Sequence, residues 1–277
     1  MNRIDQRFRA LADSGRTALI PYITAGHPSP EASVAILHAA VAAGADLLEL
    51  GMPFSDVMAD GPVIQNACAR ALDQGMNLDR VLEMVAEFRQ RDCDTPIVLM
   101  GYTNPIERRG VARFAQEAAQ AGVDALLIVD CPADEADELR AELAGRGLHQ
   151  VFLVAPTTTD RRLARTARLA GGFVYYVSIK GVTGAATLDL ASLDPAVKRI
   201  RQATELPVAV GFGIREPEQA AAVARCADGV VIGSALVDRL DACDSPEQAA
   251  EITREYLGAV RSAMDAVAAS EERVVSA

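Results

Sequence analysis

The chain has 277 residues, half of them hydrophobic, and its formal net charge at pH 7 is −11. This length suits one large α/β domain or two small ones with a sizeable core. A strongly acidic chain is expected to bind neither nucleic acid nor an anionic membrane, so an anionic substrate must be held by local donors.

The cysteines and histidines exclude further classes of protein. The five cysteines form no Cys-x-x-Cys pair, which indicates free thiols in a reducing compartment. The three histidines are far apart in sequence, so no metal site is expected. The N-terminal segment is polar, and no stretch approaches the ~20 apolar residues of a membrane helix. We therefore expect a cytoplasmic protein.

Short apolar, β-rich runs alternate along the chain with Ala-rich amphipathic stretches. The predicted strands are Ala18–Thr24, Asp46–Leu50, Pro96–Gly101, Ala125–Asp130, Gln150–Ala155, Phe173–Ser178, Pro207–Gly211 and Gly229–Gly233. After an initial helix over Arg3–Leu11, the predicted helices are Pro30–Ala43, Leu78–Arg91, Val111–Ala121, Ala133–Gly145, Asp160–Leu169, Leu193–Thr204, Glu216–Cys226 and Ser245–Ala268.

Eight such units in about 250 residues are typical of a TIM (β/α)8 barrel. The alternative, a doubly wound open sheet, usually carries a glycine-rich dinucleotide loop after its first strand. This chain has Thr24-Ala25-Gly26-His27-Pro28 there instead. We expect a single TIM-barrel domain over residues 1–277 with an extra N-terminal helix and a frayed tail over 268–277. The repeat is expected to be architectural, with no segment copying another in sequence.

Glu49 lies inside a predicted buried strand that is bounded by Gly44 and Gly51. An unpaired buried charge costs several kcal/mol, so a carboxylate here indicates a use. Alternation along the strand directs Leu47 and Glu49 into the barrel if Leu48 and Leu50 face the helices. Apolar neighbours would then raise the pKa of Glu49 and keep it a neutral proton donor. The alternative is a structural Glu paired with an arginine.

A second acid, Asp60, follows in the loop between Gly51 and Pro62. Two acids near one strand end indicate proton-transfer chemistry. The alternative for Asp60 is structural, because Asp60-Gly61 is a common turn pair. Asp56 in the same loop is expected to cap a helix or contact a partner.

Glycines follow the last predicted strands, where TIM barrels often hold a phosphate group. Glycine lets the backbone approach an anion, and a helix start adds N–H donors. A glycine after a strand is most often only a turn, but several at these strand ends together predict a phosphate-bearing substrate. The candidate contacts are Gly184, Gly213, Gly233 and Ser234. Arg215 is interpreted as a solvated surface residue.

Three tyrosines fall at or near predicted strand ends, where a ring is as often core as pocket. With three further apolar side chains they predict a cavity for a flat ring between the acids and the phosphate site. The candidates are Tyr22, Met100, Tyr102, Leu127, Tyr175 and Phe212. This site would suit cleavage or isomerisation of a phosphorylated polyol that carries an aromatic group.

These residues stand in motifs that resemble the signature of the tryptophan synthase alpha chain family, in the same order from about Leu19 to Val237. The longest and most specific is Leu48-Glu49-Leu50-Gly51-Met52-Pro53-Phe54-Ser55-Asp56, followed by Ala59-Asp60-Gly61-Pro62-Val63-Ile64-Gln65. The others are Met100-Gly101-Tyr102-Thr103-Asn104-Pro105, Gly181-Val182-Thr183-Gly184, Gly211-Phe212-Gly213-Ile214 and Gly233-Ser234-Ala235.

The resemblance implies a TIM barrel that cleaves indole-3-glycerol phosphate to indole and glyceraldehyde 3-phosphate. It also implies a beta-chain partner in an alpha2-beta2 complex, with pyridoxal phosphate in the beta chain and no cofactor in this one. Glu49 matches the family's catalytic acid/base, and Asp60 matches the carboxylate that stabilises the protonated indole ring. Tyr175 matches a residue beside the glycerol chain, and Thr183 matches a loop residue that helps to close the site. The four phosphate candidates match the family's phosphate cradle.

Asp56, Val57, Asn104 and Pro105 are the residues that the resemblance directs toward the partner. Val57 stands where the family generally has Pro, which leaves the strength of the coupling open because Val lacks the fixed φ of Pro. His27 and Cys131 also depart from the usual pattern, and neither is assigned a role.

Two other functions remain alternatives. Lys180, near the end of the sixth predicted strand, could form a Schiff base in an aldolase, although a solvated lysine in a loop stays protonated and unreactive. The chain could instead be a non-catalytic subunit that only activates a partner, but the presence of both Glu49 and Asp60 argues against this.

Overall fold

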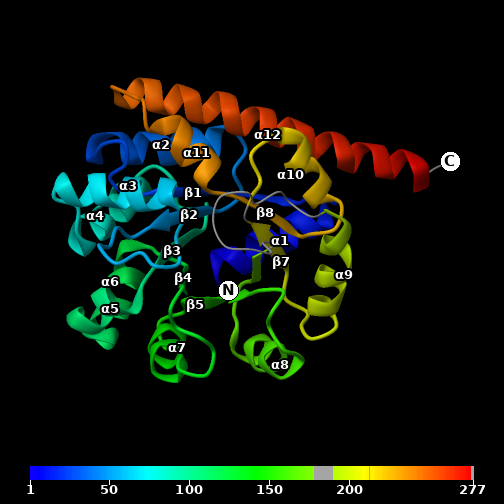
Figure 1. The fold of residues 1–277 in the computed structure, drawn as a ribbon, viewed down its shortest axis with the longest axis horizontal. Coiled ribbons are helices and arrows are strands. Elements are labelled where there is room, and N and C mark those ends of the chain that lie inside the picture. The colour runs from blue at the N-terminus through cyan, green and yellow to red at the C-terminus, as the bar shows by residue number, and fades with distance from the viewer. Residues whose placement is uncertain (178–189, 212, 276–277) are drawn as a thin grey trace.

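The computed structural model describes residues 1–177, 190–211 and 213–275, and its strands close into a barrel surrounded by helices (Figure 1). Within that part of the chain, eight parallel strands follow one another in chain order, and β8 pairs with β1 to close the ring. They are β1 (Ala18–Thr24), β2 (Leu48–Gly51), β3 (Ile97–Gly101), β4 (Ala125–Ile128), β5 (His149–Val154), β6 (Val174–Val177), β7 (Val208–Gly211) and β8 (Gly229–Ile232). The predicted TIM barrel is confirmed.

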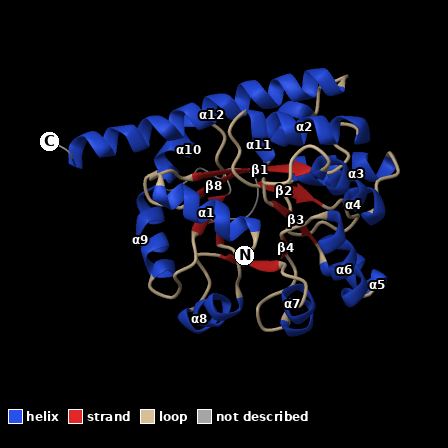
Figure 2. Ribbon diagram, turned by 180° about the vertical axis from the view of Figure 1, so that it is seen from behind, coloured by secondary structure: helices blue, strands red, loops and turns tan. Residues whose placement is uncertain are grey.

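The helices lie outside the barrel except for α1, which lies across one end of it (Figure 2). They are α1 (Arg3–Asp13), α2 (Pro30–Ala42), α3 (Pro62–Asp73), α4 (Leu78–Arg89), α5 (Thr103–Arg109), α6 (Val111–Ala121), α7 (Asp137–Ala144), α8 (Asp160–Leu169), α9 (Leu190–Arg201), α10 (Pro217–Ala224), α11 (Ser234–Leu240) and α12 (Pro246–Val275).

Helices α3, α5 and α11 have no counterpart among the predicted elements. Helix α3 begins with Pro62 in its first turn and buries Ile64, Ala67, Cys68 and Ala71. This i, i+3, i+4, i+7 spacing is the sequence signal that could have identified it. Helices α5 and α11 are seven residues each, too short for a clear helical period.

The interior of the barrel and the layer beneath the helices form separate apolar clusters. Leu48 and Leu50 pack with helix residues in the outer cluster, whereas Leu47 packs in the inner cluster with residues such as Val98 and Leu127. The predicted alternation along β2 is confirmed, and it directs Glu49 into the barrel.

Helix α1 closes the N-terminal end of the barrel. Its buried residues Ile4, Phe8 and Leu11 belong to the inner cluster, and the Phe8 and Phe173 ring centroids are 5.6 Å apart. The opposite end, where the strands finish, is therefore the end open to a ligand.

Three strands start just after an aspartate that fixes their register. Each aspartate accepts a hydrogen bond from a backbone N–H of the preceding strand and pairs with an arginine. The contacts are Asp46 with Leu19 N (2.9 Å) and Arg261, Asp124 with Ile97 N (2.9 Å) and Arg89, and Asp228 with Val208 N (2.8 Å) and Arg201. Gly44-Ala45-Asp46 and Gly122-Val123-Asp124 share this role, and they agree in sequence only in their glycine and aspartate.

The C-terminal helix α12 packs on α2 and α10, and its last turns project past the barrel (Figures 1 and 2). Arg261 anchors it, because its guanidinium donates to Thr17 O (3.0 Å) and pairs with Asp46. The helix continues to Val275, beyond the predicted end at Ala268.

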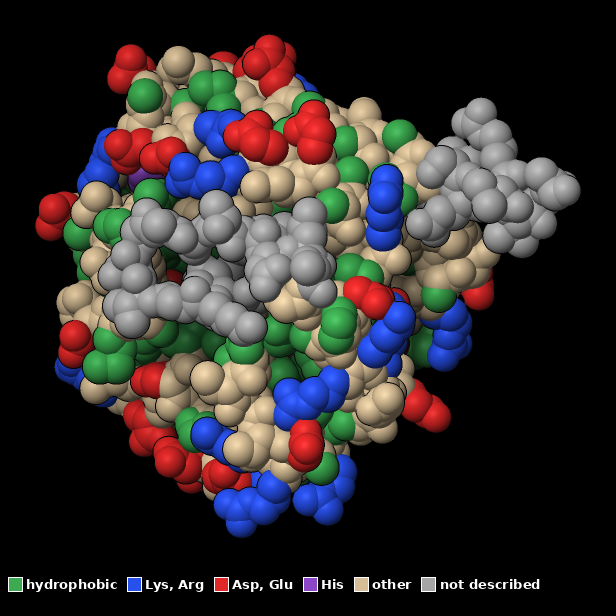
Figure 3. All heavy atoms as spheres, turned by 45° about the vertical axis from the view of Figure 1, so that its right-hand side comes forward, with side chains coloured by type: hydrophobic (Ala, Val, Ile, Leu, Met, Phe, Trp, Pro, Cys, Tyr) green, Lys and Arg blue, Asp and Glu red, His purple; other side chains and the backbone are tan. Residues whose placement is uncertain are grey.

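The face drawn in Figure 3 carries acidic and basic side chains interspersed, with hydrophobic side chains gathered near its middle. The net charge of −11 is thus not concentrated in one patch on this face. Among the described helices none is long and apolar enough to cross a membrane.

Candidate active site

Glu49 lies near the C-terminal end of β2, pointing into the barrel, and is only 2% exposed. Within the described residues its Oε1 atom has no hydrogen-bond partner, and no arginine pairs with it. Burial raises the pKa of the Glu49 carboxyl to about 8, and the negative charge of Asp60 adds to the shift. The carboxyl is therefore a neutral acid at pH 7, as predicted. The alternative, a structural glutamate paired with an arginine, has no support among the described residues.

Asp60 lies in the loop between β2 and α3 and faces a tyrosine that follows β3. The Tyr102 hydroxyl donates to Asp60 Oδ2 (2.7 Å) and accepts from Ala59 N (3.1 Å). Burial raises the pKa of Asp60, whereas the Tyr102 hydrogen bond opposes this by stabilising the carboxylate. The Asp60 side chain is thus fixed at the mouth of the barrel by Tyr102. A residue that served only to form the turn would not need this contact.

Tyr22 and Tyr175 each lean over a glycine at the end of the next strand. A Cβ atom on Gly51 would collide with the Tyr22 hydroxyl, and one on Gly211 would collide with the Tyr175 hydroxyl. Burial raises the pKa of both phenols well above 10, and the charges of Glu49 and Asp60 raise it further. Both hydroxyls therefore stay neutral beside the two carboxyl groups.

An apolar cluster, here called the mouth cluster, joins the predicted ring pocket to the loop after β2. It contains Tyr22, Val57, Ile64, Ala67, Cys68, Tyr102 and Val237, with Met100 packed against it. Met100 also contacts the inner cluster, which contains Leu127 and Tyr175. The structure thus brings together five of the six candidates for the ring pocket, while Phe212 lies outside the described residues.

The predicted phosphate contacts are only partly described. Gly213 has a φ of +77°, a conformation that side chains rarely adopt. Gly233 precedes Ser234, the first residue of α11, and among the described residues a Cβ on Gly233 would make only an ordinary contact, with the Tyr22 Cβ at 3.7 Å. Gly233 thus lies directly before a helix start at the barrel mouth, where backbone N–H groups are free to bind an anion. Gly184 and Thr183 lie outside the described residues, as does Lys180.

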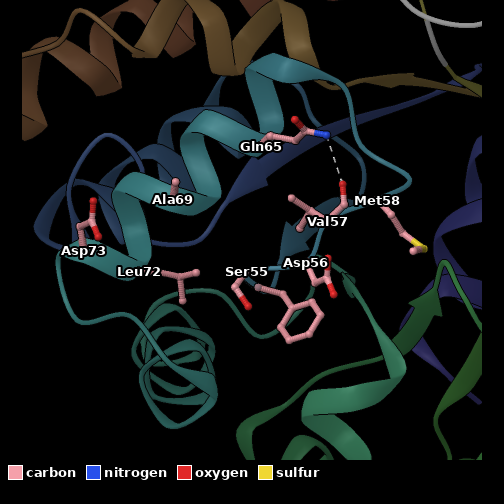
Figure 4. A pocket seen from close by; sticks show the side chains of 9 residues that line it. Ser55, Asp56, Val57, Met58, Gln65, Ala69, Leu72 and Asp73 are labelled. Carbon is pink, nitrogen blue, oxygen red and sulfur yellow. Dashed lines mark hydrogen bonds between the residues drawn. The ribbon is translucent and has the colours of Figure 1, made fainter.

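Two of the four predicted partner-facing residues, Asp56 and Val57, line a cavity of about 440 Å³ between the loop after β2 and α3, whereas Asn104 and Pro105 are not among its lining residues (Figure 4). Gln65 Nε2 on α3 donates to Val57 O (3.4 Å) at its edge. Asp56 and Asn104 are exposed, and Met58 is 80% exposed. The cavity is lined by Phe54, Ser55, Asp56, Val57, Met58, Gln65, Ala69, Leu72 and Asp73.

Two contributors to the site were missed in the sequence, because their roles depend on side-chain contacts at the barrel mouth, one within β1 and one made by α3. Thr24 donates from Oγ1 to the Tyr22 hydroxyl (3.2 Å), and Cys68 packs in the mouth cluster. Burial raises the pKa of the Cys68 thiol to about 11, so it stays a thiol. The described residues contain no group of three or more His, Cys, Asp or Glu that could hold a metal ion.

Known proteins that resemble this chain match it over nearly its full length. A family model described as tryptophan synthase alpha chain matches residues 8–265. The tryptophan synthase alpha chain of Laribacter hongkongensis is 58% identical over 266 residues, which cover 96% of this chain and 100% of that one. That of Nitrosococcus oceani is 53% identical over 267 residues, which cover 96% and 98%.

Solved structures agree with these relatives. Tryptophan synthase subunit alpha from Legionella pneumophila str. Paris gives a TM-score of 0.88 at 42% identity and covers 96% of this chain and 99% of that one. The aminoacrylate-bound tryptophan synthase from M. tuberculosis gives 0.85 at 34% identity and covers 95% and 100%.

The closed parallel barrel, with a shielded carboxyl group at the end where its strands finish, defines a TIM-barrel enzyme. More particularly, the chain belongs to the tryptophan synthase alpha chain family.

Proposed function

We propose that this chain cleaves indole-3-glycerol phosphate to indole and glyceraldehyde 3-phosphate in tryptophan biosynthesis, with Glu49 and Asp60 as its catalytic groups. Its family consists of lyases that act on this substrate. The observation that carries the assignment of residues is Glu49, which is 2% exposed and whose Oε1 lacks a partner among the described residues. A neutral carboxyl group in that setting is a ready proton donor.

The retro-aldol reaction explains why two acids with different environments are needed. Glu49, as the neutral acid, gives its proton to the indole carbon that bears the glycerol chain. The ring nitrogen becomes cationic, and Asp60, held by Tyr102, stabilises this charge as a carboxylate. Glu49, now ionised, takes the proton of the adjacent side-chain hydroxyl. The carbon–carbon bond then breaks to give the aldehyde, the ring nitrogen becomes neutral, and Glu49 is protonated again.

The remaining candidates surround the reacting atoms in this proposal. Tyr22, Met100, Tyr102 and Leu127 would line the indole ring, and Tyr175 would lie beside the glycerol chain, with Thr183 and Phe212 completing the wall. Gly184, Gly213, Gly233 and Ser234 would hold the phosphate group. Support comes from the mouth cluster, the positive φ of Gly213 and the place of Gly233 directly before α11.

We further propose that the chain works with a tryptophan synthase beta chain in an alpha2-beta2 complex, and that pyridoxal phosphate belongs to that partner. Asp56, Val57, Asn104 and Pro105 would face it. The 440 Å³ cavity lined by Asp56 and Val57 supports this placement. The free cysteines support a reducing, cytoplasmic location.

Replacing Glu49 by Gln tests the assignment, since glutamine keeps the shape and removes the proton. We expect Glu49→Gln to retain the fold and the binding of indole-3-glycerol phosphate but less than a few per cent of the rate of indole release, because lost general acid–base catalysis costs about 100-fold or more. Glu83→Gln on the exposed face of α4 is the matched control and should retain full activity. Substantial activity in Glu49→Gln would exclude Glu49 as the acid.

A second experiment tests the partner. The indole and tryptophan formed from indole-3-glycerol phosphate should be measured for the chain alone, for a beta chain alone and for their mixture. We expect the mixture to release tryptophan faster than the chain alone releases indole. Equal rates would argue against the partner.

A further inference from the structure

Tyr22 is the neighbour of Glu49 in the adjacent strand. The register pairs Tyr22 with Glu49 and Thr24 with Gly51. Adjacent strands lie about 4.8 Å apart, and side chains two residues apart share a face. Ala18 and Ile20 belong to the inner cluster, so Tyr22 also points into the barrel, beside Glu49.

Gly51 fixes where the Tyr22 ring lies. Gly51 is two residues beyond Glu49 on the same face, one step closer to the barrel mouth. A Cβ at Gly51 would come within 2.6 Å of Tyr22 Cζ and within 2.8 Å of Tyr22 Cε2, besides colliding with the hydroxyl. The backbone of Gly51 does not require glycine, because its φ is not positive. The Tyr22 ring therefore occupies the space that a side chain at position 51 would need.

This position puts the ring between Glu49 and the open end of the barrel. The hydroxyl is held there by Thr24 Oγ1 at 3.2 Å, and Thr24 is itself 1% exposed. Val57 and Cys68 pack around Tyr22 in the mouth cluster, so the ring has little freedom to swing away. Tyr22 is 6% exposed, against 2% for Glu49 beneath it.

We propose that Tyr22 is a positioning residue for Glu49, whose ring, seated over Gly51 and tied to Thr24, keeps water away from the Glu49 carboxyl. This deepens the proposed function, because it assigns the shielding of the acid to one side chain. It differs from a contact with the substrate, since the ring acts on Glu49 before any substrate binds.

The shielding has a measurable consequence in the ionisation of Glu49. Desolvation is the main cause that raises the pKa of Glu49, and among the described residues the titratable groups that face it are Asp60 from the loop after β2, Tyr22 from β1 and Tyr175 from β6. The two phenols stay neutral, so Asp60 is the only charge among these three. Removing the Tyr22 ring should therefore lower the pKa through hydration, and removing the Asp60 charge should lower it through loss of repulsion.

The test is a carbon-13 NMR titration of the free chain labelled at the glutamate carboxyl carbon, with the Glu49 signal assigned by its absence in Glu49→Gln. In the wild-type chain burial of the Glu49 carboxyl, helped by the charge of Asp60, raises its pKa to about 8, so the signal should titrate well above the ordinary range of a glutamate. Tyr22→Leu, which removes the ring, should lower this midpoint by about one unit or more. Tyr22→Phe keeps the ring and should leave the midpoint within about 0.3 unit. Asp60→Asn should lower the midpoint as well and serves as the positive control.

Gly51→Ala tests the close packing of the Tyr22 ring over Gly51 without altering Tyr22 itself. It should displace the ring, lower the Glu49 midpoint in the same direction as Tyr22→Leu, and lower the urea midpoint of unfolding. In a Tyr22→Leu background the same alanine should cost little stability, because the clash is gone.

Two results would overturn the proposal: a Glu49 midpoint unchanged in both Tyr22→Leu and Gly51→Ala, or an equal shift in Tyr22→Phe and Tyr22→Leu. Both readouts are made without substrate. A failure of the proposed role of Glu49 as the catalytic acid would appear as an active Glu49→Gln enzyme and would leave this titration untouched.

Discussion

The buried carboxyl groups at the two ends of the barrel differ in whether they have hydrogen-bond and ion-pair partners. At the N-terminal end, Asp46 and Asp124 are 4% and 2% exposed, and each accepts a backbone N–H and pairs with an arginine. At the mouth, Glu49 is equally buried, but its Oε1 lacks a partner among the described residues. A desolvated charge without a partner costs several kcal/mol, so the acid at the mouth stays protonated. Burial alone therefore does not distinguish these acids, whereas the presence or absence of a partner among the described residues does.

Asp124→Asn should give the largest effect on stability at the N-terminal end. Asp124 pairs with Arg89 (2.9 Å) and Arg3 (3.0 Å), and the Arg89 side chain is itself only 10% exposed. Removing the charge leaves Arg89 buried without its counter-ion, and we expect the free energy of unfolding to fall by about 3 kcal/mol. Urea denaturation at pH 7 measures this. Asp134→Asn, which breaks the exposed pair with Arg165, is the control and should cost less than about 1 kcal/mol.

At the mouth, Glu49→Gln should have the opposite sign and stabilise the chain at high pH. The pKa of Glu49 is about 8 in the folded chain, against an ordinary value of 4.5. Between those values the unfolded chain has released a proton that the folded chain keeps, so this group lowers stability as pH rises, up to about pH 8. Glutamine cannot ionise, and its advantage over wild type should grow from near zero at pH 4.5 to a few kcal/mol at pH 8.5.

Urea denaturation at pH 5 and pH 8.5 checks this. The surface variant Glu83→Gln should differ from wild type equally at both pH values. A Glu49→Gln advantage that does not change with pH would mean that Glu49 ionises normally.

Tyr102→Phe should weaken catalysis without affecting Glu49 directly. The lost hydroxyl donates to Asp60 Oδ2 at 2.7 Å, and a hydrogen bond to a charged group contributes about 1.5–3 kcal/mol. We expect the rate of indole release to fall by about tenfold. Because that bond lowers the pKa of Asp60, its loss should move the acid side of the pH–rate profile to higher pH.

Tyr256→Phe is the control for this change, since its hydroxyl donates to Arg215 O at 2.8 Å on the α12 side of the molecule. It should change the rate by less than about twofold and leave the profile in place. A fall in rate for Tyr102→Phe without any movement of the profile would show that the hydroxyl contacts the substrate and does not tune Asp60.

The sequence allowed the barrel and the direction of Glu49 to be predicted, because both depend on local patterns. Continuous apolar runs mark strands that are buried on both faces, and alternation from Leu47 to Leu50 fixes which side chains point inward. The rise in the pKa of Glu49 follows from the same pattern.

The partners of the acids could not be predicted, since they come from distant parts of the chain. Nothing near Asp124 in sequence indicates Arg3 or Arg89, and nothing near Asp60 indicates Tyr102. The seat of Tyr22 over Gly51 depends on strand register, which a single sequence does not specify. The fold could thus be predicted from local chemistry, whereas the distinction between a structural and a functional acid needed the three-dimensional contacts.

Asp194→Asn should cause the smallest loss of stability among these variants, because it breaks an exposed ion pair. It is the comparison for the buried pair that Asp124→Asn breaks. Asp194 pairs with Lys198 one turn along α9 at 2.7 Å, but the two side chains are 52% and 68% exposed. Water already solvates both charges, so we expect a loss of no more than about 0.5 kcal/mol in urea denaturation. The loss should disappear in 1 M salt, where the screening length is about 3 Å, whereas the loss from Asp124→Asn should persist because salt cannot enter that pair. A salt-insensitive cost of more than 1 kcal/mol would mean that exposure does not separate weak from strong ion pairs in this barrel.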